Sequence, residues 1–166
     1  MFSGCLGRLA ALLVLLGAGT VVGACHFGQT TSAPAGIGQE VIDGKFAFIV
    51  TEVNSSRTFA DKRAQGVYEI VSVAVRNVGT QAQFFEWAAQ RLKDRTGREY
   101  SANFMVPPLF GSVVNSLDPG LQVSLKLAFD VPPGTKPTQL VLHDSVSSHG
   151  AQVNLTQPPS PPPQRG

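Results

Sequence analysis

Alternation of apolar and polar residues is the dominant pattern between residues 39 and 156. The clearest run is residues 121–131 (LQVSLKLAFDV), in which every second residue is a large apolar one. A period of two places successive side chains on opposite faces of a strand. The same pattern occurs in 67–77 and 45–53, and shorter candidate strands are 39–42, 83–87, 89–93, 99–102, 138–143 and 151–155. The buried faces are expected to hold Leu121, Val123, Leu125, Leu127, Phe129 and Val131, together with Val71, Val73, Val75, Phe46, Phe48 and Val50.

Turn-forming residues separate these candidate strands. Asp94-Arg95-Thr96-Gly97, Asp118-Pro119-Gly120 and Pro132-Pro133-Gly134 combine proline, which fixes φ, with glycine, which permits positive φ. No long helical period and no internal repeat occurs among them. Because each strand has one apolar face, two sheets must bury these faces against each other. We therefore predict an all-β fold, an immunoglobulin-like antiparallel β-sandwich, for residues 39–156.

The N-terminal residues have the layout of a secretory leader. Arg8 precedes 14 residues without a charged side chain, Leu9–Val22. This length is typical of the apolar core of a signal peptide and is short for a membrane span, which needs about 17–25 residues. We assign residues 1–24 to a signal peptide. A retained membrane anchor is the alternative.

The leader ends in Val22-Gly23-Ala24-Cys25, which resembles the bacterial lipoprotein box. That resemblance implies cleavage between Ala24 and Cys25 and attachment of lipid to the Cys25 thiol. Two or more acyl chains hold a protein stably on a bilayer, whereas one holds it only marginally. A small-x-small sequence at residues 33–35 is a weaker candidate cleavage site, because it lies well beyond the apolar core.

The two cysteines of the chain, Cys5 and Cys25, agree with this interpretation. Cleavage before Cys25 removes Cys5, so the mature chain cannot form an internal disulfide. An unpaired cysteine in an exported protein needs an explanation, and lipidation provides one. We therefore expect a cell-membrane location on the extracytoplasmic side, with the membrane as a partner through the N-terminal lipid.

Both flanks of the predicted sandwich have the composition of irregular chain. Residues 25–38 are rich in Gly, Ser, Thr and Pro and are expected to form a lipidated N-terminus and flexible linker. Residues 157–166 form a Pro-rich tail, which is expected to be a solvated end. Without Arg8 the chain has 12 basic and 11 acidic residues and no basic stripe, so nucleic acid is not an expected partner.

Four strings in order, VSVAVRNVG (71–79), LKDRTGREY (92–100), LDPG (117–120) and LAFDVP (127–132), resemble a family of small immunoglobulin-like bacterial envelope proteins. Members are secreted or lipid-anchored in Gram-positive bacteria and actinobacteria, and the immunoprotective secreted antigen of mycobacteria is similar in fold. The resemblance covers residues 38–155. Its matching residues set strand and turn conformation, so it implies a fold and an envelope location and supplies no catalytic residue.

No sequence motif of a common enzyme class occurs after residue 25. The most suggestive cluster is His143, Asp144 and His149, which could bind a metal or serve a hydrolase with Ser145 or Ser147 as nucleophile. However, neighbouring residues of a strand point to opposite faces, so His143 and Asp144 should not converge. We therefore interpret these residues as solvated loop positions, and expect no metal, no cofactor and no catalysis.

Residues 104–117 (FMVPPLFGSVVNSL) are apolar but follow neither a strand nor a helix period. One interpretation is an exposed patch that contacts a partner through Phe104, Met105, Leu109 and Phe110. The favoured interpretation is a connection whose side chains cover one end of the core. Trp87 is likewise expected in the core rather than on the surface.

The sequence as a whole predicts a lipid-anchored envelope protein that acts as a binding or interaction module for an unknown envelope protein or ligand. A carrier of an apolar small molecule or lipid is an alternative and would have an enclosed cavity between the sheets. A hydrolase is a further alternative and would have a polar cleft around His143 and His149.

Overall fold

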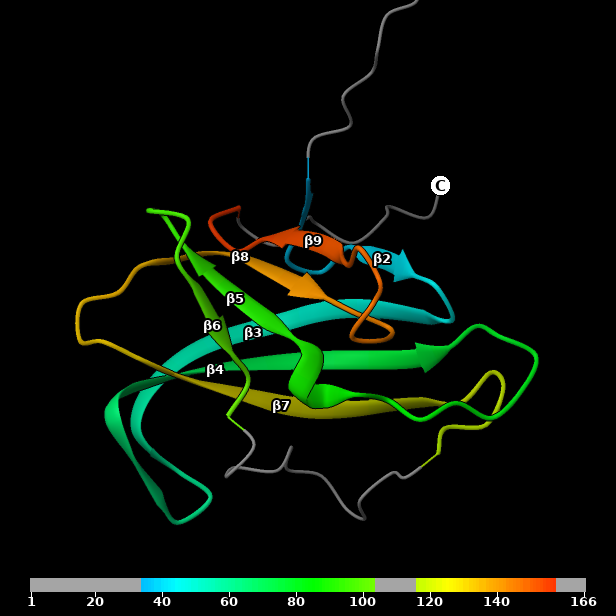
Figure 1. The fold of residues 1–166 in the computed structure, drawn as a ribbon, viewed down its shortest axis with the longest axis horizontal. Helices are drawn as coiled ribbons and strands as arrows, with labels where there is room; N and C mark the ends of the chain where they lie inside the picture. The colour runs from blue at the N-terminus through cyan, green and yellow to red at the C-terminus, as the bar shows by residue number, and fades with distance from the viewer. Residues whose placement is uncertain (1–33, 104–115, 158–166) are drawn as a thin grey trace, which may run out of the picture. The chain divides into compact units, whose positions relative to one another are not determined.

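The computed structural model describes residues 34–103 and 116–157. Within them, nine strands form two sheets that lie face to face (Figure 1). The strand order is β2-β3-β4-β7 in one sheet and β1-β9-β8-β5-β6 in the other. Neighbouring strands are antiparallel, except that β1 and β9 are parallel. The predicted all-β sandwich is confirmed.

The four-stranded sheet contains the longest strands: β2 (Glu40–Asp43), β3 (Phe46–Phe59), β4 (Lys62–Asn77) and β7 (Gln122–Val131). The five-stranded sheet contains shorter ones: β1 (Ala35–Gly36), β5 (Arg91–Asp94), β6 (Glu99–Ser101), β8 (Pro137–Leu142) and β9 (Ala151–Asn154). A 3-10 helix, η1 (Trp87–Ala89), precedes β5. The described residues include no helix that is both long and apolar enough to span a bilayer.

The core fills the space between the two sheets with side chains from the predicted inward faces. Val71, Val73 and Val75 of β4 are at most 1% exposed and pack with Leu92, Leu140 and Val153 of the other sheet. The rings of Phe46, Phe48 and Phe85 lie together, with centroids 5.6–6.1 Å apart. Burying each such side chain contributes about 1.5–3 kcal/mol, so this shared core holds the two sheets together.

Strand β7 begins one residue later than its pattern suggests. Leu125, Leu127 and Phe129 are buried as predicted, but Leu121 is 55% exposed, so its expected place in the core is wrong. Leu121 belongs to the turn that begins at Asp118, and its carbonyl accepts a hydrogen bond from the backbone N–H of Asn77 (3.0 Å). Its side chain therefore lies before Gln122, the first residue of β7 that pairs with β4.

The β3–β4 hairpin is longer than predicted. It reaches a two-residue turn at Ala60 and Asp61, which have φ angles of 48° and 59°. Two β-bulges interrupt the pairing with β4, which increases the local twist. Hairpin residues then pack on the outer face of the four-stranded sheet, where they form a second apolar cluster: Tyr68, Ile70 and Ala128 with Phe59, Ala60 and Ala64.

The expected strand at residues 83–87 is wrong. Gln83 makes an isolated bridge to Leu117, and the chain then turns into η1. Phe85 is buried in the core, whereas the neighbouring Phe84 is 54% exposed. The side chains thus alternate as in a strand, but residues 84–87 pair with no other strand among the described residues. The structure also differs at residues 35–36, which already pair with β9 as β1.

Candidate functional site

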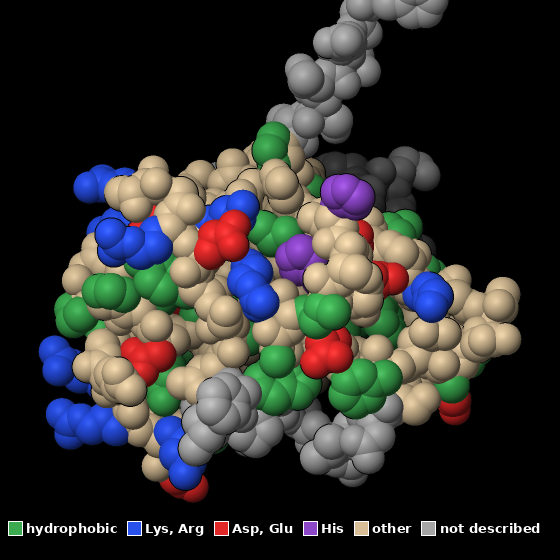
Figure 2. All heavy atoms as spheres, in the orientation of Figure 1, with side chains coloured by type: hydrophobic (Ala, Val, Ile, Leu, Met, Phe, Trp, Pro, Cys, Tyr) green, Lys and Arg blue, Asp and Glu red, His purple; other side chains and the backbone are tan. Residues whose placement is uncertain are grey.

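The outer face of the five-stranded sheet carries charged and polar side chains. Strand β5 presents Arg91 and Lys93 on this face, because Leu92 between them points into the core. Lys93 pairs with Glu99 of β6 at 2.8 Å. Figure 2 shows both described histidine side chains on one face, with basic and acidic side chains beside them. The outer face of this sheet is therefore polar, whereas its inner face packs in the core.

The loop between β8 and β9 lies against this face. Gly150 has φ of 75°, and a Cβ added there would lie 2.7 Å from Cε1 of His143. Glycine thus lets the loop approach the sheet more closely than a side chain would permit. Within the loop, Ser148 Oγ donates a hydrogen bond to the carbonyl of Ser145 (3.1 Å).

His143 is fixed by this loop and by a buried glutamine. Its Nδ1 lies 3.2 Å from the carbonyl oxygen of Ser148, which can only accept, so this contact assigns the hydrogen to Nδ1. The side chain of Gln90, 0% exposed, accepts from the backbone N–H of His143 (2.7 Å) and donates to its carbonyl (3.0 Å). The end of β8 is therefore held to the start of β5, and Nε2 of His143 makes no hydrogen bond to another residue of 34–103 and 116–157.

The loop and the sheet enclose a hollow of about 250 Å³, which we call the histidine pocket. The buried Val141 lies in its lining, with Arg91 and Lys93 from β5. The complete lining is Ala89, Arg91, Lys93, Glu99, Val141, His143, Val146, His149 and Gln152. Four strands, the end of η1 and the β8–β9 loop thus contribute to a single polar pocket.

The electrostatics of the histidine pocket are set by its cations. A hydrogen bond from Lys93, and then the charge of Lys93, hold the pKa of Glu99 below its usual range, with smaller contributions from Arg91 and His143. The Nη1 group of Arg91 donates to the backbone carbonyls of Ala88 (2.8 Å) and Gln90 (2.9 Å). The guanidinium is therefore held in place by the backbone rather than by a carboxylate.

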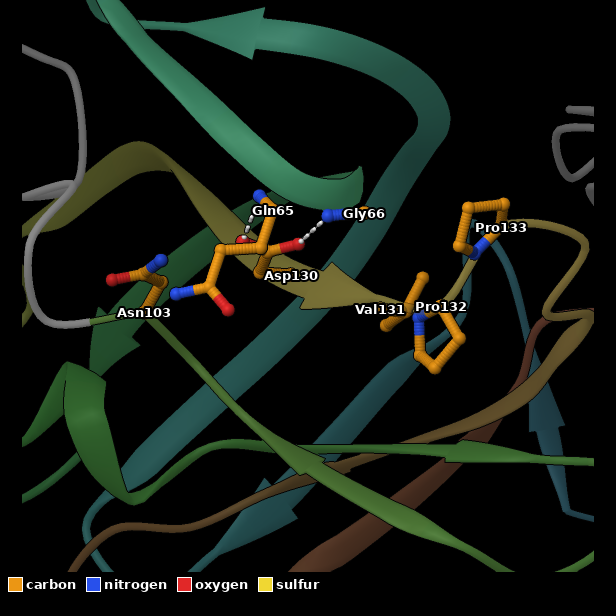
Figure 3. Close-up of a pocket in the computed structure, with 7 residues that line it drawn as sticks. All are labelled: Gln65, Gly66, Asn103, Asp130, Val131, Pro132 and Pro133. Atoms are coloured by element: carbon orange, nitrogen blue, oxygen red, sulfur yellow. Dashed lines mark hydrogen bonds between the residues drawn. The ribbon is translucent and has the colours of Figure 1, made fainter.

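A second, larger hollow of about 700 Å³ lies beside the ends of β4 and β7 (Figure 3). Its central side chain is Asp130, whose carboxylate accepts from the backbone N–H groups of Gln65 (2.8 Å) and Gly66 (2.9 Å). We call it the Asp130 pocket; its lining is Gln65, Gly66, Asn103, Asp130, Val131, Pro132 and Pro133. Because the carboxylate of Asp130 is bonded to the backbone of β4, it stabilises the β3–β4 hairpin and has fewer lone pairs available to a ligand.

The sequence from residue 35 to residue 153 matches the family described as "Domain of unknown function (DUF4352)". This chain belongs to the DUF4352 family. None of the curated proteins matches it.

Solved structures share the fold of this DUF4352 domain. The secreted protein MPT63 of Mycobacterium tuberculosis aligns with a TM-score of 0.56 and 14% identity, over 75% of this chain and 98% of its own. The yjhA protein of Bacillus subtilis aligns with a TM-score of 0.53 and 16% identity, over 73% of this chain and 99% of its own. At such identities the similarity concerns the fold alone.

Within the DUF4352 domain, the predicted histidine cluster is brought together only in part. Both histidines lie in the loop after β8, where His149 is exposed, as expected, and His143 is half-buried; together they line one pocket. Asp144 does not line this pocket, in agreement with the expectation that it would not converge with His143; its carboxylate accepts from the backbone N–H of Lys45 (3.4 Å). No group of three metal-binding side chains occurs among residues 34–103 and 116–157.

The serine next to His143 is also not one that sequence analysis named. Ser148 lies 3.2 Å from the His143 ring, whereas Ser145 and Ser147 contact each other at 3.4 Å. The hydroxyl hydrogen of Ser148 is donated to the Ser145 carbonyl, and Nδ1 of His143 carries a hydrogen itself. These contacts tie the loop to the His143 ring.

Several predicted site residues lie outside the described part of the chain. These are Ala24 and Cys25 at the expected lipidation site and Phe104, Met105, Leu109 and Phe110 of the candidate partner patch. Leu117, at the end of that segment, is described and is 3% exposed in the core. Trp87 is partly buried and packs against the core.

Arg91, Lys93 and Glu99 were missed as site residues. Their positions could have indicated a shared polar face, because each is an outward-facing residue of a strand that the alternation predicted. What the sequence does not contain is the pairing of β5 with both β6 and β8, which brings these charges beside His143.

Proposed function

We propose that this protein is lipid-anchored on the extracytoplasmic side of the cell membrane, where its DUF4352 sandwich binds a ligand or partner without catalysis. The proposed anchor rests on the lipoprotein-like box ending in Cys25 and the apolar leader before it. The first strand begins at Ala35, so only nine residues separate it from Cys25. One protein of the same fold is described as secreted, in keeping with this location.

The histidine pocket is the observation that supports a binding role. Its polar side chains are held in place before any ligand arrives: Arg91 by two carbonyls, His143 by the loop and by Gln90. Such preorganisation lowers the conformational entropy lost on binding. The absence of catalysis remains part of the proposal, and the hydrogen-bonding of Ser148 described above supports it.

The alternatives of a lipid carrier and a hydrolase have less support. A carrier needs an enclosed cavity between the sheets, whereas the described core is filled by close-packed aromatic and aliphatic side chains. A hydrolase does have the expected polar pocket around His143 and His149, but the nearby serine is engaged with the backbone. Binding requires neither feature.

The anchor is tested by labelling cells of a Gram-positive host with radioactive palmitate. The unchanged chain and a Cys5→Ala control should carry label and remain with the membrane. The Cys25→Ala variant should lose the label. Label retained in Cys25→Ala, or a free thiol at Cys25 still joined to Ala24, would refute lipid attachment at this residue.

The binding role is tested by placing a photo-crosslinking residue at Gln152, which is exposed and lines the histidine pocket. Gln122, which is exposed on β7 of the other sheet, is the matched control position. Illumination of intact cells should give a discrete adduct from position 152 and none from 122. Equal labelling from both positions, or none from either, would contradict a binding role for this face.

A further inference from the structure

The lining of the histidine pocket has more positive than negative charge. Arg91 and Lys93 are cations and Glu99 is a carboxylate, so the formal charge is +1 while both imidazoles are neutral. The other lining residues are not ionisable: Ala89, Val141, Val146 and Gln152. The pocket therefore has the composition of an anion site.

Hydrogen-bond donors remain available in this pocket. Only Nη1 of Arg91 is bonded to other described residues, so the rest of its guanidinium fork can donate to a ligand. The His149 ring makes no hydrogen bond to any other residue within 34–103 and 116–157, and it lies in the same lining. When protonated, both imidazoles add N–H donors to those of Arg91 and Lys93.

We infer that the histidine pocket binds a tetrahedral oxyanion of the phosphate and sulfate class. Guanidinium and ammonium groups form short, charge-assisted hydrogen bonds to such oxygens, and the planar fork of Arg91 suits two at once. This inference rests on the proposed binding role and names the ligand class for it.

The charged groups around the imidazoles favour an anion over a metal ion. Arg91 and Lys93 on β5 are cations beside the rings, and they repel a metal ion. The carboxylate of Glu99 on β6 is already paired with Lys93. Asp144 points away toward Lys45, so it does not neutralise the pocket.

Sulfate is a suitable probe because it is a tetrahedral oxyanion whose charge does not change near neutral pH. The full-length chain, purified in an uncharged detergent, is titrated with sodium sulfate by calorimetry at neutral pH. Saturable binding is expected, because Arg91 and Lys93 line the same pocket and can both donate to the oxygens of the anion. The absence of sulfate binding would overturn the inference.

Matched variants locate the site. Lys93→Gln and Arg91→Gln should each weaken sulfate binding by about tenfold, the usual effect of losing a hydrogen bond to a charged group. Lys62→Gln, which removes the same charge from the distant hairpin, should leave binding unchanged. Glu99→Gln should strengthen binding because it removes the only carboxylate in the lining, a gain that misfolding cannot produce. Weaker binding in Glu99→Gln, or equal losses in Lys93→Gln and Lys62→Gln, would refute the placement.

The source of the oxyanion is distinguished by competition against sulfate. Inorganic phosphate represents a soluble ligand, and phosphatidylglycerol added to the detergent micelles represents a lipid headgroup. Competition by either confirms the ligand class and identifies its source, whereas competition by neither refutes phosphate recognition. A crosslinked partner at position 152 without sulfate binding would refute this inference alone and leave the proposed binding role standing.

Discussion

The Asp130 pocket is the larger of the two hollows, at about 700 Å³ against about 250 Å³ for the histidine pocket. A more important difference is whether their polar side chains are fully bonded to the protein itself. Asp130 accepts two backbone N–H groups and fixes the start of β4 against β7. Arg91 is instead anchored through one nitrogen and keeps its other donors.

This difference shows that volume alone does not identify a binding site. A polar side chain whose hydrogen bonds all serve the fold stabilises the protein, but it has little left to offer a ligand. A side chain that is held in place by some of its atoms and free at others is preorganised for binding. We therefore expect substitutions in the Asp130 pocket to change stability, and substitutions in the histidine pocket to change both stability and binding.

The largest expected effect is on stability, from Gly66→Ala in the Asp130 pocket. A Cβ at Gly66 would overlap the carbonyl oxygen of Val131, a backbone atom that cannot move without shifting β7. We expect a loss of about 3 kcal/mol in the free energy of unfolding, measured by urea denaturation. Sulfate affinity of the folded variant should be unchanged.

Gly134→Ala is the matched control for this change. Gly134 has φ of 81°, but nothing lies within 4 Å of an added Cβ, so only backbone strain is introduced. The expected cost is about 1 kcal/mol. An equal loss of unfolding free energy in Gly66→Ala and Gly134→Ala would show that the Val131 carbonyl does not approach Gly66 as closely as described.

The next largest effect is expected from Gln90→Ala, which couples stability to the histidine pocket. The variant leaves the backbone N–H and carbonyl of His143 and the carbonyl of Glu86 without their side-chain partner. Buried groups left unpaired in this way cost about 2–3 kcal/mol in total. Because His143 also loses its anchor, sulfate binding should weaken in the same variant.

Gln139→Ala provides the comparison on the same sheet. Among the described residues the Gln139 side chain bonds to Gln152 alone, and this hydrogen bond is exposed, so its loss should change the unfolding free energy by less than about 0.5 kcal/mol. If sulfate affinity were unchanged in Gln90→Ala, the claim that Gln90 positions His143 for binding would be wrong.

Much of the fold follows from the alternation of apolar residues, since every described strand of four or more residues was predicted at least in part. The hairpin beyond Val53 could not be predicted because its residues are polar and its turn has no glycine. Ala60 and Asp61 adopt positive φ angles there, a conformation usually signalled by Asn-Gly. The energy that favours this extension comes from apolar contacts with Tyr68 and Ile70, which are tertiary.

The candidate site was less predictable than the fold. His143 and His149 were identified by residue type, but their convergence depends on Gly150 and on the path of one loop. Lys93 and Glu99 face each other across β5 and β6, a pairing that the turn at residues 94–97 does suggest. The pairing of β5 with β8 joins residues about fifty positions apart, and no local signal specifies it.

Two buried carboxylates, one in each sheet, extend the comparison to pH. Asp94 of the five-stranded sheet accepts hydrogen bonds from the hydroxyl and N–H of Thr96, the N–H of Arg98 and the hydroxyl of Tyr100. These donors, that of the Thr96 hydroxyl first, lower its pKa from 3.8 to about 2. Glu69 of the four-stranded sheet has a hydroxyl partner in Ser55, and burial raises its pKa although Ser55 and Lys136 act in the opposite direction.

The smallest expected effect follows from Glu69→Gln and depends on the sign of that shift. Because the folded state favours protonated Glu69, this residue's stabilising contribution is complete below its ordinary pKa of 4.5 and is lost as the pH rises through its raised value. Glutamine stays neutral, so the variant should be more stable than the parent at neutral pH and equal to it in acid. Asp94→Asn should behave oppositely, less stable than the parent at neutral pH, with the difference shrinking as the pH falls from 3.8 toward about 2. Urea denaturation at several pH values measures both differences. If Glu69→Gln were the less stable protein at neutral pH, the Ser55 hydroxyl and Lys136 would outweigh burial. The two carboxylates would then not differ in the direction of their pKa shifts, and the greater number of donors around Asp94 would not distinguish them.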